Sequence, residues 1–449
     1  MVPLLGGGQR AYVNLDNAAS TPPLKAVGQA VDDFLPYYSS VHRGTGFKSL
    51  LSTHFYESAR EAVLGFLNAD AAEHACIFGK NTTEAINKLA HRFPFSAERD
   101  IVLTTMMEHH SNDLPWRGAA KTVHIGVTRD GQLDEQDLDR KLSMYAKRVA
   151  LVAITGASNV TGFINPVHQI AEKAHAVGAL ILVDCAQFAP HRKINMRRLS
   201  DPGHLDFVTI SAHKMYAPFG TGALVGRKEM FERGDPDVRG GGTVMIVTVD
   251  DVVWAEAPER DEAGSPNTVG AVALGAAIHQ LQEVGMDNIV QHEAELTSDA
   301  LTRMQELPDI HIYGDSNPAT TADRLGSIPF ELSGMSHFQV AAILGYEFGI
   351  GVRSGCFCAH PYLLNLLNVS QEQAEVTRNS MLAGDRSNMP GLIRASFGLY
   401  NTTEDIDALV DALKRIAAGG YKGEYIQDKS SGEYIPQGWS PDFERYFSL

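Results

Sequence analysis

The sequence lacks several features that would place it in a special class of protein. It has only four cysteines in 449 residues, too few for a disulfide framework in a chain of this length, which favours a reducing compartment. No apolar run is long enough to cross a bilayer, and residues 1–8 contain neither the basic nor the apolar segment of a signal peptide. We therefore expect a cytoplasmic protein that has no membrane partner.

Basic side chains are also in short supply. The chain has 38 Lys and Arg against 54 Asp and Glu, a formal net charge of -16, which opposes binding to nucleic acid or to anionic surfaces. No basic patch interleaved with aromatic residues occurs, so we expect no nucleic-acid partner. What the chain does have is length and 44% hydrophobic residues, enough for two domains with substantial cores.

A lysine follows a predicted strand in the middle of the chain. Residues 207–210 are apolar and β-branched and predict a short buried strand, which leads into Ser211-Ala212-His213-Lys214. A desolvated amine with cationic neighbours has a lowered pKa and reacts readily with carbonyl groups. Taken alone, this stretch is more often a solvated lysine on a loop.

An acidic residue ends another predicted strand about thirty residues upstream. Residues 179–183 are apolar and Asp184 follows them, as expected for a central parallel strand whose carboxyl end faces a ligand. An Asp can pair with a protonated ring nitrogen and a Lys can hold an aldehyde covalently, the division of labour of a pyridoxal-phosphate (PLP) site. Strands and helices alternate from residue 76 to 225, which predicts a doubly wound, mostly parallel α/β sheet.

A phosphate site is predicted where the strand 76–78 turns through Gly79 into a helix that Thr82 and Thr83 are expected to cap. The free N–H groups and the dipole of a first helical turn favour an anion. The glycine fingerprint of a dinucleotide site is missing from this setting, so a dinucleotide is not indicated.

These motifs resemble one known family. Asp184-x-x-Gln187 followed by Ser211-x-His213-Lys214 is similar to the class V aminotransferases, which are fold-type I PLP enzymes, and most of all to their cysteine desulfurase and selenocysteine lyase branch (group II cysteine desulfurases). The resemblance covers nearly the whole chain, except the segment 370–388 and the tail after residue 419. It implies a large cofactor-binding domain, 14–282, and a smaller α+β domain made of 1–13 and 283–449.

The resemblance assigns cofactor contacts. It implies that Lys214 binds the cofactor and later takes the substrate Cα proton, that Asp184 pairs with the ring nitrogen and that Gln187 bonds the ring hydroxyl. It implies a phosphate held by the side chains of Thr82, Thr83, Ser211 and His213. His109 would stack on the ring and move protons, with His110 as the alternative. Adjacent histidines rarely point at one ion, and no third ligand occurs nearby, so we expect no metal site.

The second decisive stretch is Arg353-Ser354-Gly355-Cys356-Phe357-Cys358-Ala359-His360-Pro361. The Ala-x-Pro that follows Cys358 matches the family nucleophile, whereas Cys356 stands where histidine is common. If the stretch is extended, the two cysteines share a face, and Cys356 could relay sulfur. The alternatives are two buried, inert cysteines, or a metal knuckle for which no second Cys pair exists. The Cys-Phe-Cys version is also similar to molybdenum-cofactor sulfurases.

The remaining site residues concern the substrate and the partner subunit. Arg394 would clamp the substrate carboxylate with two parallel hydrogen bonds, which a lysine cannot reproduce. The resemblance also places Asn159, His42 and Arg353 near the substrate. Ser265 stands where the family usually has Thr and would reach the phosphate of a partner subunit, which implies a homodimer.

The implied activity is the conversion of L-cysteine, or a related amino acid, to alanine, with a persulfide left on the enzyme for a sulfur-acceptor protein. Other chemistries on the same scaffold stay open: a C–S lyase, a selenocysteine lyase, an epimerase, or a molybdenum-cofactor sulfurase-like protein. A catalytically silent sulfur-relay protein is a further alternative, against which the presence of Lys214, Asp184 and Arg394 argues.

Overall fold

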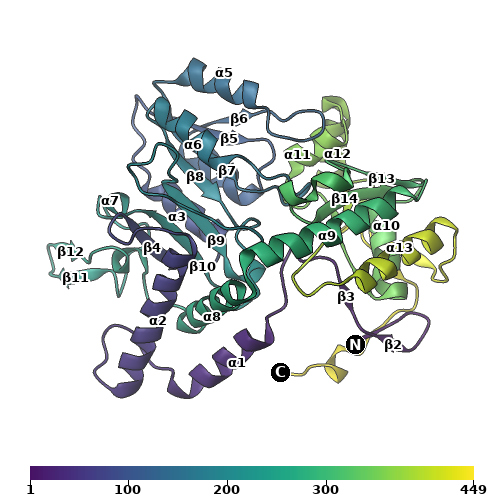
Figure 1. Cartoon of the computed structure of the whole chain (residues 1–449), viewed down its shortest axis with the longest axis horizontal. Helices are drawn as coiled ribbons and strands as arrows, with labels where there is room; N and C mark the ends of the chain where they lie inside the picture. Colours follow the sequence, from purple (N-terminus) through teal and green to yellow (C-terminus); the bar gives the residue numbers. More distant parts are fainter. The chain divides into compact units, whose positions relative to one another are not determined.

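The computed structural model describes residues 1–449, and contacts divide the chain into two units (Figure 1). The sheet unit contains residues 18–292 and 323–325. The C-terminal unit contains residues 1–17, 293–322 and 326–449. The predicted domains, 14–282 and 1–13 with 283–449, stay a prediction about which parts fold independently.

A seven-stranded sheet forms the centre of the sheet unit, in the order β4-β10-β9-β8-β7-β5-β6. Its strands are β4 (His74–Gly79), β5 (Ile101–Thr105), β6 (Lys121–Ile125), β7 (Val149–Thr155), β8 (Leu180–Asp184), β9 (Phe207–Ser211) and β10 (Gly222–Arg227). Only β10 runs antiparallel to its neighbours, β4 and β9, while the other adjacent pairs are parallel. The predicted α/β fold with a mostly parallel sheet is confirmed.

Burial explains why these strands are nearly continuous apolar runs. Every residue of β5, β7 and β9 is buried, because helices cover the faces of a parallel sheet. The helices between the strands are α3 (Thr82–Arg92), α4 (Leu114–Ala119), α5 (Glu135–Tyr145), α6 (Val167–Ala176) and the short α7 (Lys228–Phe231). Trp116, Phe207 and Phe231 fill the core beside them.

Two further helices of this unit, α1 (Lys25–Phe34) and α2 (Phe47–Phe66), each pack on a third, α8 (Thr268–Val284). A hairpin of β11 (Val244–Val247) and β12 (Val252–Trp254) extends from the unit. Helix α9 (Met286–Gln305) continues into the C-terminal unit.

The C-terminal unit is built on an antiparallel sheet in the order β13-β14-β17-β16. Its strands are β13 (Ile310–Ile312), β14 (Ser327–Leu332), β16 (Arg353–Gly355) and β17 (Leu392–Ser396), and its helices after α9 are α10 (His337–Phe348), α11 (His360–Leu366), α12 (Gln371–Leu382) and α13 (Thr403–Ala417). Short pairs join β1 (Val2–Pro3) to β2 (Gln9–Arg10), β3 (Val13–Asn14) to β15 (Ile350–Gly351) and β18 (Tyr425–Gln427) to β19 (Tyr434–Pro436).

The polar segment 370–388 contains helix α12, which a capping box of Ser370 and Gln373 starts. None of the residues of α12 is buried. No helix of the chain combines the length and the apolar content that crossing a membrane requires.

Candidate functional site

The carboxyl ends of the parallel strands bring most of the predicted cofactor residues to one edge of the sheet. Asp184 ends β8 and lies in register with Thr155 of β7 and Thr209 of β9, while Ser211 ends β9. Ligands of open α/β sheets bind at this edge. We call the residues there the sheet-edge cluster: Thr82, Thr83, Glu108, His109, Asp184, Gln187, Ser211, His213 and Lys214.

Asp184 is the most deeply placed acid of this cluster. Its side chain is buried, and its Oδ1 accepts the N–H of Ala186 at 2.9 Å. Burial raises the pKa of Asp184, while the Ala186 N–H and the charge of Lys214 oppose that rise. A buried carboxylate with one backbone donor is a suitable partner for a cationic group of a ligand.

The turn that carries Lys214 is held by the segment that begins the sheet unit. Lys214 ends a short 3₁₀ helix, Ala212–Lys214, and Thr21 donates its N–H to the carbonyl oxygen of His213 at 2.9 Å. In the same segment, the carbonyl oxygen of Ala18 accepts a hydrogen bond from Nε2 of Gln187 at 2.6 Å. Burial and the charge of Lys214 lower the pKa of His213 to about 4, so this ring is neutral at pH 7.

The predicted phosphate seat has a different cap from the one expected. Asn81, not a threonine, caps α3, and its Oδ1 accepts the N–H of Glu84 at 3.0 Å. Ser211 Oγ accepts the N–H of Thr82 at 2.9 Å, so two donors of the first turn are already bonded within the chain. An anion here would use the N–H of Thr83 and the nearby hydroxyls.

Gly222 allows this seat to form. A Cβ at Gly222 would lie 2.6 Å from Cα of Asn81 and 2.7 Å from the carbonyl oxygen of Ile210. Only glycine therefore permits the start of β10 to pass so close to the cap of α3.

A hydroxyl chain links this seat to His109. Thr83 Oγ1 and Ser111 Oγ are 2.7 Å apart, and Ser111 Oγ lies 2.9 Å from His109 Nδ1. The backbone N–H of Ser111 also donates to Nδ1, at 3.1 Å, so Nδ1 is an acceptor and the neutral ring carries its proton on Nε2. Sequence reasoning missed Ser111, although its hydroxyl two residues after a functional histidine was a usable signal.

Glu108 was also missed as a site residue. Its buried carboxylate accepts hydrogen bonds from Thr105 Oγ1 at 2.5 Å, from the Thr155 N–H at 2.9 Å and from Asn112 Nδ2 at 2.8 Å. Burial raises the pKa of Glu108 to about 8, more than these donors lower it, and the charge of Asp184 adds to the rise. Glu108 thereby ties β5 to β7 beside the predicted ring site.

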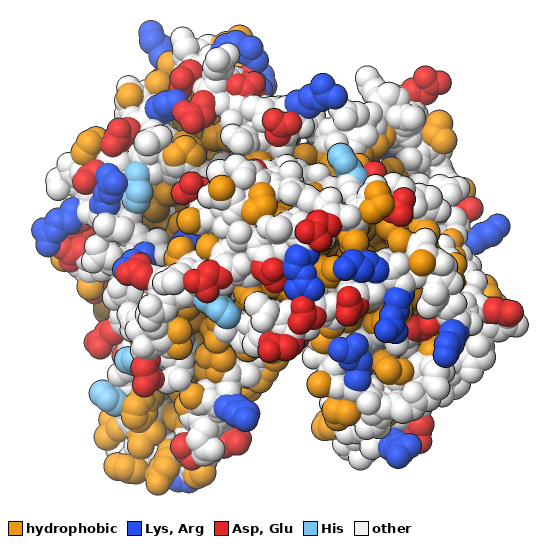
Figure 2. Space-filling view, turned by 45° about the vertical axis from the view of Figure 1, so that its right-hand side comes forward, with side chains coloured by type: hydrophobic (Ala, Val, Ile, Leu, Met, Phe, Trp, Pro, Cys, Tyr) orange, Lys and Arg blue, Asp and Glu red, His pale blue; other side chains and the backbone are white.

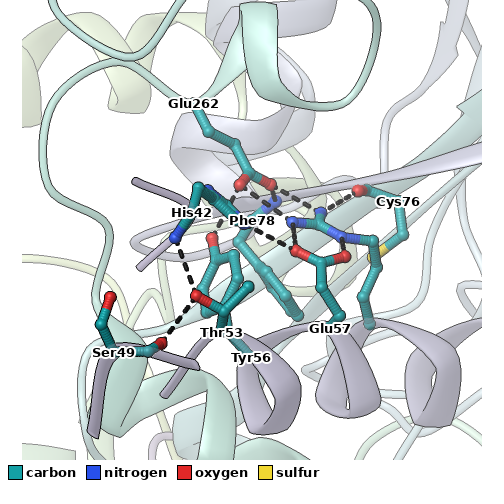
Figure 3. Close-up of polar contacts among 9 residues, drawn as sticks. His42, Ser49, Thr53, Tyr56, Glu57, Cys76, Phe78 and Glu262 are labelled. Carbon is teal, nitrogen blue, oxygen red and sulfur yellow. Dashed lines mark hydrogen bonds and ion pairs between the residues drawn. The ribbon is translucent and has the colours of Figure 1, made fainter. Parts of the chain in front are cut away.

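His42 lies in a separate part of the sheet unit, in a polar network around a buried arginine (Figure 3). The guanidinium of Arg60 forms two hydrogen bonds with Glu262, at 2.8 and 3.1 Å, and a third with Glu57. Glu57 in turn lies 2.8 Å from His42 Nε2, and Tyr56 donates its hydroxyl to Glu262 at 2.7 Å. Sequence reasoning did not identify this network, because its members are far apart along the chain.

The network positions the walls of a cavity of about 470 Å³, lined in part by His42, Arg43, Glu262 and Ser265. None of the sheet-edge cluster lines this cavity. Asn159 is buried in the turn after β7. The predicted site residues of the sheet unit therefore form two groups and not one.

In the C-terminal unit, the two cysteines of the predicted nucleophile stretch differ sharply. Cys358 is exposed, whereas Cys356 is buried and donates its S–H to the carbonyl oxygen of Pro390 at 3.0 Å. Burial and the neighbouring Cys358 raise the pKa of Cys356 to about 12. Phe357 and Cys358 have φ angles of 52° and 54°, so the stretch is not extended and the premise that both cysteines share one face fails.

Arg394 lies beside this stretch, on the buried strand β17. Its guanidinium donates to Asp16 Oδ1 at 3.0 Å and lies 4.9 Å above the ring of Phe357. Arg353 pairs in register with Arg394 but is exposed, and its Nη1 is 3.8 Å from the other oxygen of Asp16. Cys358, Arg394 and Arg353 thus lie in one unit, with Asp16 between the arginines.

One group outside these sites could offer metal ligands: His175, His204 and Asp206. The two rings stack in parallel, with centroids 4.1 Å apart, so their in-plane lone pairs do not converge on one point. Each ring lies within 3.2 Å of a different oxygen of Asp206, and Arg227 also pairs with this carboxylate. The group is an ion-pair cluster that ties α6 to β9 and β10.

Comparison with known proteins identifies the family. The profile described as "Aminotransferase class-V" matches residues 13–409. A probable cysteine desulfurase of Halalkalibacterium halodurans is 39% identical over 90% of this chain and 92% of its own, and one of Streptomyces coelicolor is 36% identical over the same shares. The apo structure of a cysteine desulfurase from Thermococcus onnurineus superposes with a TM-score of 0.78 at 33% identity, covering 91% of this chain and 95% of the other. The predicted resemblance is confirmed, and the chain belongs to the aminotransferase class-V family.

Proposed function

We propose that this chain is a PLP-dependent cysteine desulfurase, which converts L-cysteine to L-alanine and leaves the sulfur on Cys358 as a persulfide. The observation that carries the proposal is the exposed Cys358 thiol, next to the buried carboxylate clamp Arg394, in a chain 39% identical to a probable cysteine desulfurase. A lyase or an epimerase needs no such thiol.

The donor set of the sheet-edge cluster fits the cofactor. The family is typically PLP-dependent, and a buried Asp184 with one backbone donor suits a protonated ring nitrogen, whose pKa the ion pair would raise. Gln187 would bond the ring hydroxyl, and His109 would lie against the ring. Neutral His213 would hold the phosphate together with the hydroxyls of Ser211, Thr82 and Thr83.

When bound, PLP supplies an aldehyde that joins amines and a ring that accepts electrons from the substrate Cα. Lys214 would hold this aldehyde covalently, and its amine, once released, would act as the base that takes the Cα proton of the substrate. Arg394 orients the substrate through its carboxylate, with Arg353, Asn159 and His42 as further substrate contacts.

The Cys358 thiolate then attacks the substrate sulfur. The new S–S bond forms as the Cβ–S bond breaks, and the electron pair of the broken bond passes to the carbon side, where protonation completes alanine. The persulfide is then available to a sulfur-acceptor protein.

The assay that tests the function follows three products. The purified protein with PLP and L-cysteine should release alanine in amounts equal to the sulfur bound or released, without pyruvate. Sulfide together with pyruvate would identify a C–S lyase, and racemised substrate an epimerase. Parallel reactions with selenocysteine would separate a selenocysteine lyase, and transfer to molybdenum cofactor a sulfurase.

A homodimer belongs to the same proposal, with Ser265 contacting the phosphate of the partner. Its support is an exposed apolar surface: hydrophobic side chains gather at the lower left of Figure 2, over the lower ends of α1 and α2. The exposed residues of this region are Leu35, Tyr37, Tyr38, Phe47, Leu50 and Phe55. A monomer in sedimentation that kept full cofactor affinity would contradict it. A cytoplasmic location stays a prediction from the sequence.

A further inference from the structure

Two segments near the end of the chain contact each other. One is the insertion that follows α12, residues 383–391. The other is the C-terminal hairpin of β18 and β19, residues 425–436, which lies beyond the family match of residues 13–409. The N–H of Arg386 donates to the carbonyl of Lys429 at 2.8 Å, and Gln427 Nε2 donates to the carbonyl of Ser387 at 2.9 Å. The hairpin therefore holds the insertion by its backbone.

The other side of the insertion contacts the nucleophile stretch. Cys356 donates its S–H to the carbonyl of Pro390, and the carbonyl of Met389 lies 3.0 Å from His337 Nε2. A Cβ at Gly391 would lie 2.8 Å from Cα of Gly355, so the two backbones pass in direct contact. Residues 389–391 thus form one wall of the loop that ends in Cys358.

That loop has a backbone that must be held from outside. Phe357 and Cys358 both have left-handed φ angles, a conformation that side chains other than glycine adopt at an energetic cost and keep only when their surroundings impose it. Contacts that hold this backbone include the hydrogen bond from the Ala359 N–H to the carbonyl of Cys356 at 2.9 Å, the Arg394 guanidinium over Phe357, and the Cys356–Pro390 hydrogen bond. The Cys356–Pro390 hydrogen bond depends on the insertion.

We propose that the C-terminal hairpin and residues 383–391 form a brace that positions the nucleophile Cys358 by keeping Cys356 buried against Pro390. The proposal rests on the proposed function, in which Cys358 is the catalytic residue; the residues of the brace are positioning residues. It gives a role to the hairpin, which lies beyond the family match. Loosening the hairpin should expose Cys356 and displace Cys358, with no change at the sheet-edge cluster.

Gly432 offers a sharp variant with a matched control. A Cβ there would lie 2.8 Å from the carbonyl oxygen of Arg386 and from the ring of Phe338, so Gly432→Val pushes the hairpin off both. Gly438, in the same tail, has a φ of 74°, similar to the 83° of Gly432, but a Cβ at Gly438 would meet no atom within 4 Å. Gly438→Val therefore introduces the backbone strain without the steric clash. A milder pair is Gln427→Ala, which removes two hydrogen bonds, and Gln437→Ala, an exposed neighbour.

The readout is alkylation of Cys356 by iodoacetamide in a Cys358→Ala background, located by peptide mass spectrometry. We expect labelling of Cys356 to rise about tenfold in Gly432→Val and to a lesser extent in Gln427→Ala, since the loop opens locally, and to stay at the parental rate in both controls. With Cys358 present, the same two variants should lose kcat for alanine formation and keep the cofactor absorbance.

Two results would overturn the brace: Cys356 labelling in Gly432→Val and Gln427→Ala equal to their controls, or raised labelling with unchanged kcat. Thiol labelling needs neither cofactor nor turnover. A parent protein that makes no alanine therefore refutes the proposed function, while the labelling still decides whether the hairpin holds the loop.

Discussion

The sheet-edge cluster and the Cys358 loop are held in position by different kinds of contact. In the sheet unit, Asp184 and Ser211 are the last residues of buried parallel strands, so the ladder of the sheet itself sets their positions. In the C-terminal unit, Cys358 is exposed on a loop of left-handed residues, which side-chain and carbonyl contacts hold from the outside. The hydrogen-bonded strands of the sheet thus position the binding residues, whereas contacts with neighbouring side chains and carbonyl groups position the nucleophile.

This difference suits the two tasks. A cofactor that remains bound through many turnovers needs a preformed site, whereas a nucleophile that must deliver sulfur to an acceptor has to remain accessible. Variants in the sheet-edge cluster should therefore affect the bound cofactor, and variants in the Cys358 loop should affect the chemical step while the cofactor remains bound.

The largest effect is expected for Lys214→Ala, which removes the proposed covalent anchor. The parent protein should be yellow, and borohydride should fix the cofactor on Lys214, as peptide mass spectrometry can locate. The variant should show no such adduct and lose alanine formation by a factor of about a thousand or more, as when a covalent catalyst is removed. Lys25→Ala, an exposed control, should behave as the parent. An adduct on any other lysine would refute the assignment.

Cys358→Ala should abolish alanine formation while the cofactor remains bound and still responds spectrally to L-cysteine, because the loss affects the chemical step and not substrate binding. Cys356→Ala should slow turnover by about threefold at most, because a buried thiol with a pKa of about 12 is a poor nucleophile. If Cys358→Ala kept the parental rate and Cys356→Ala did not, the roles would be reversed.

Arg394→Lys should raise the KM for L-cysteine by about tenfold to a hundredfold, because an ammonium cannot make the paired hydrogen bonds of a guanidinium to a carboxylate. Arg353→Lys should have a smaller effect, since Arg353 is exposed and 3.8 Å from Asp16. Equal effects of the two variants on KM would show that burial on β17 does not distinguish them.

The smallest effect on catalysis is expected for Glu108→Gln, whose measurement is the free energy of unfolding against pH. The pKa of Glu108, about 8 in the fold, lies above the ordinary value for Glu. The folded state therefore holds more protons than the unfolded state between about pH 4.5 and 8, and this contribution to stability is lost as the pH rises through that window. Relative to the parent, Glu108→Gln should gain stability there by up to about 1.4 kcal/mol per pH unit, whereas exposed Glu98→Gln should not. A gain that did not vary with pH would contradict the raised pKa.

Much of the sheet unit could be predicted from sequence, because its signals are local. The apolar runs that end in Asp184 and Ser211 predicted β8 and β9, and the resulting α/β fold is confirmed. The predicted threonine cap of α3 was wrong. Asn81 and Thr82 are both residue types that cap helices well, and only the backbone geometry selects Asn81.

What could not be predicted depends on residues far apart along the chain. The pair Arg60 and Glu262 bridges 202 positions, and neither residue belongs to a recognisable motif. Helix α12 was missed because it buries no side chain and so shows no amphipathic pattern. The premise that Cys356 and Cys358 lie on an extended stretch was wrong because a distant residue helps to fix the backbone there. The hydrogen bond from Cys356 to Pro390 spans 34 residues.

Asp16 has a consequence for how a substrate would enter. In the free chain its carboxylate already neutralises Arg394, in the manner of an internal mimic of an amino-acid carboxylate. If Arg394 receives the substrate, binding is an exchange of one carboxylate for another and not a capture by an open cation. Such an exchange leaves the local charge nearly constant, so the apparent affinity for amino acids should depend only weakly on ionic strength.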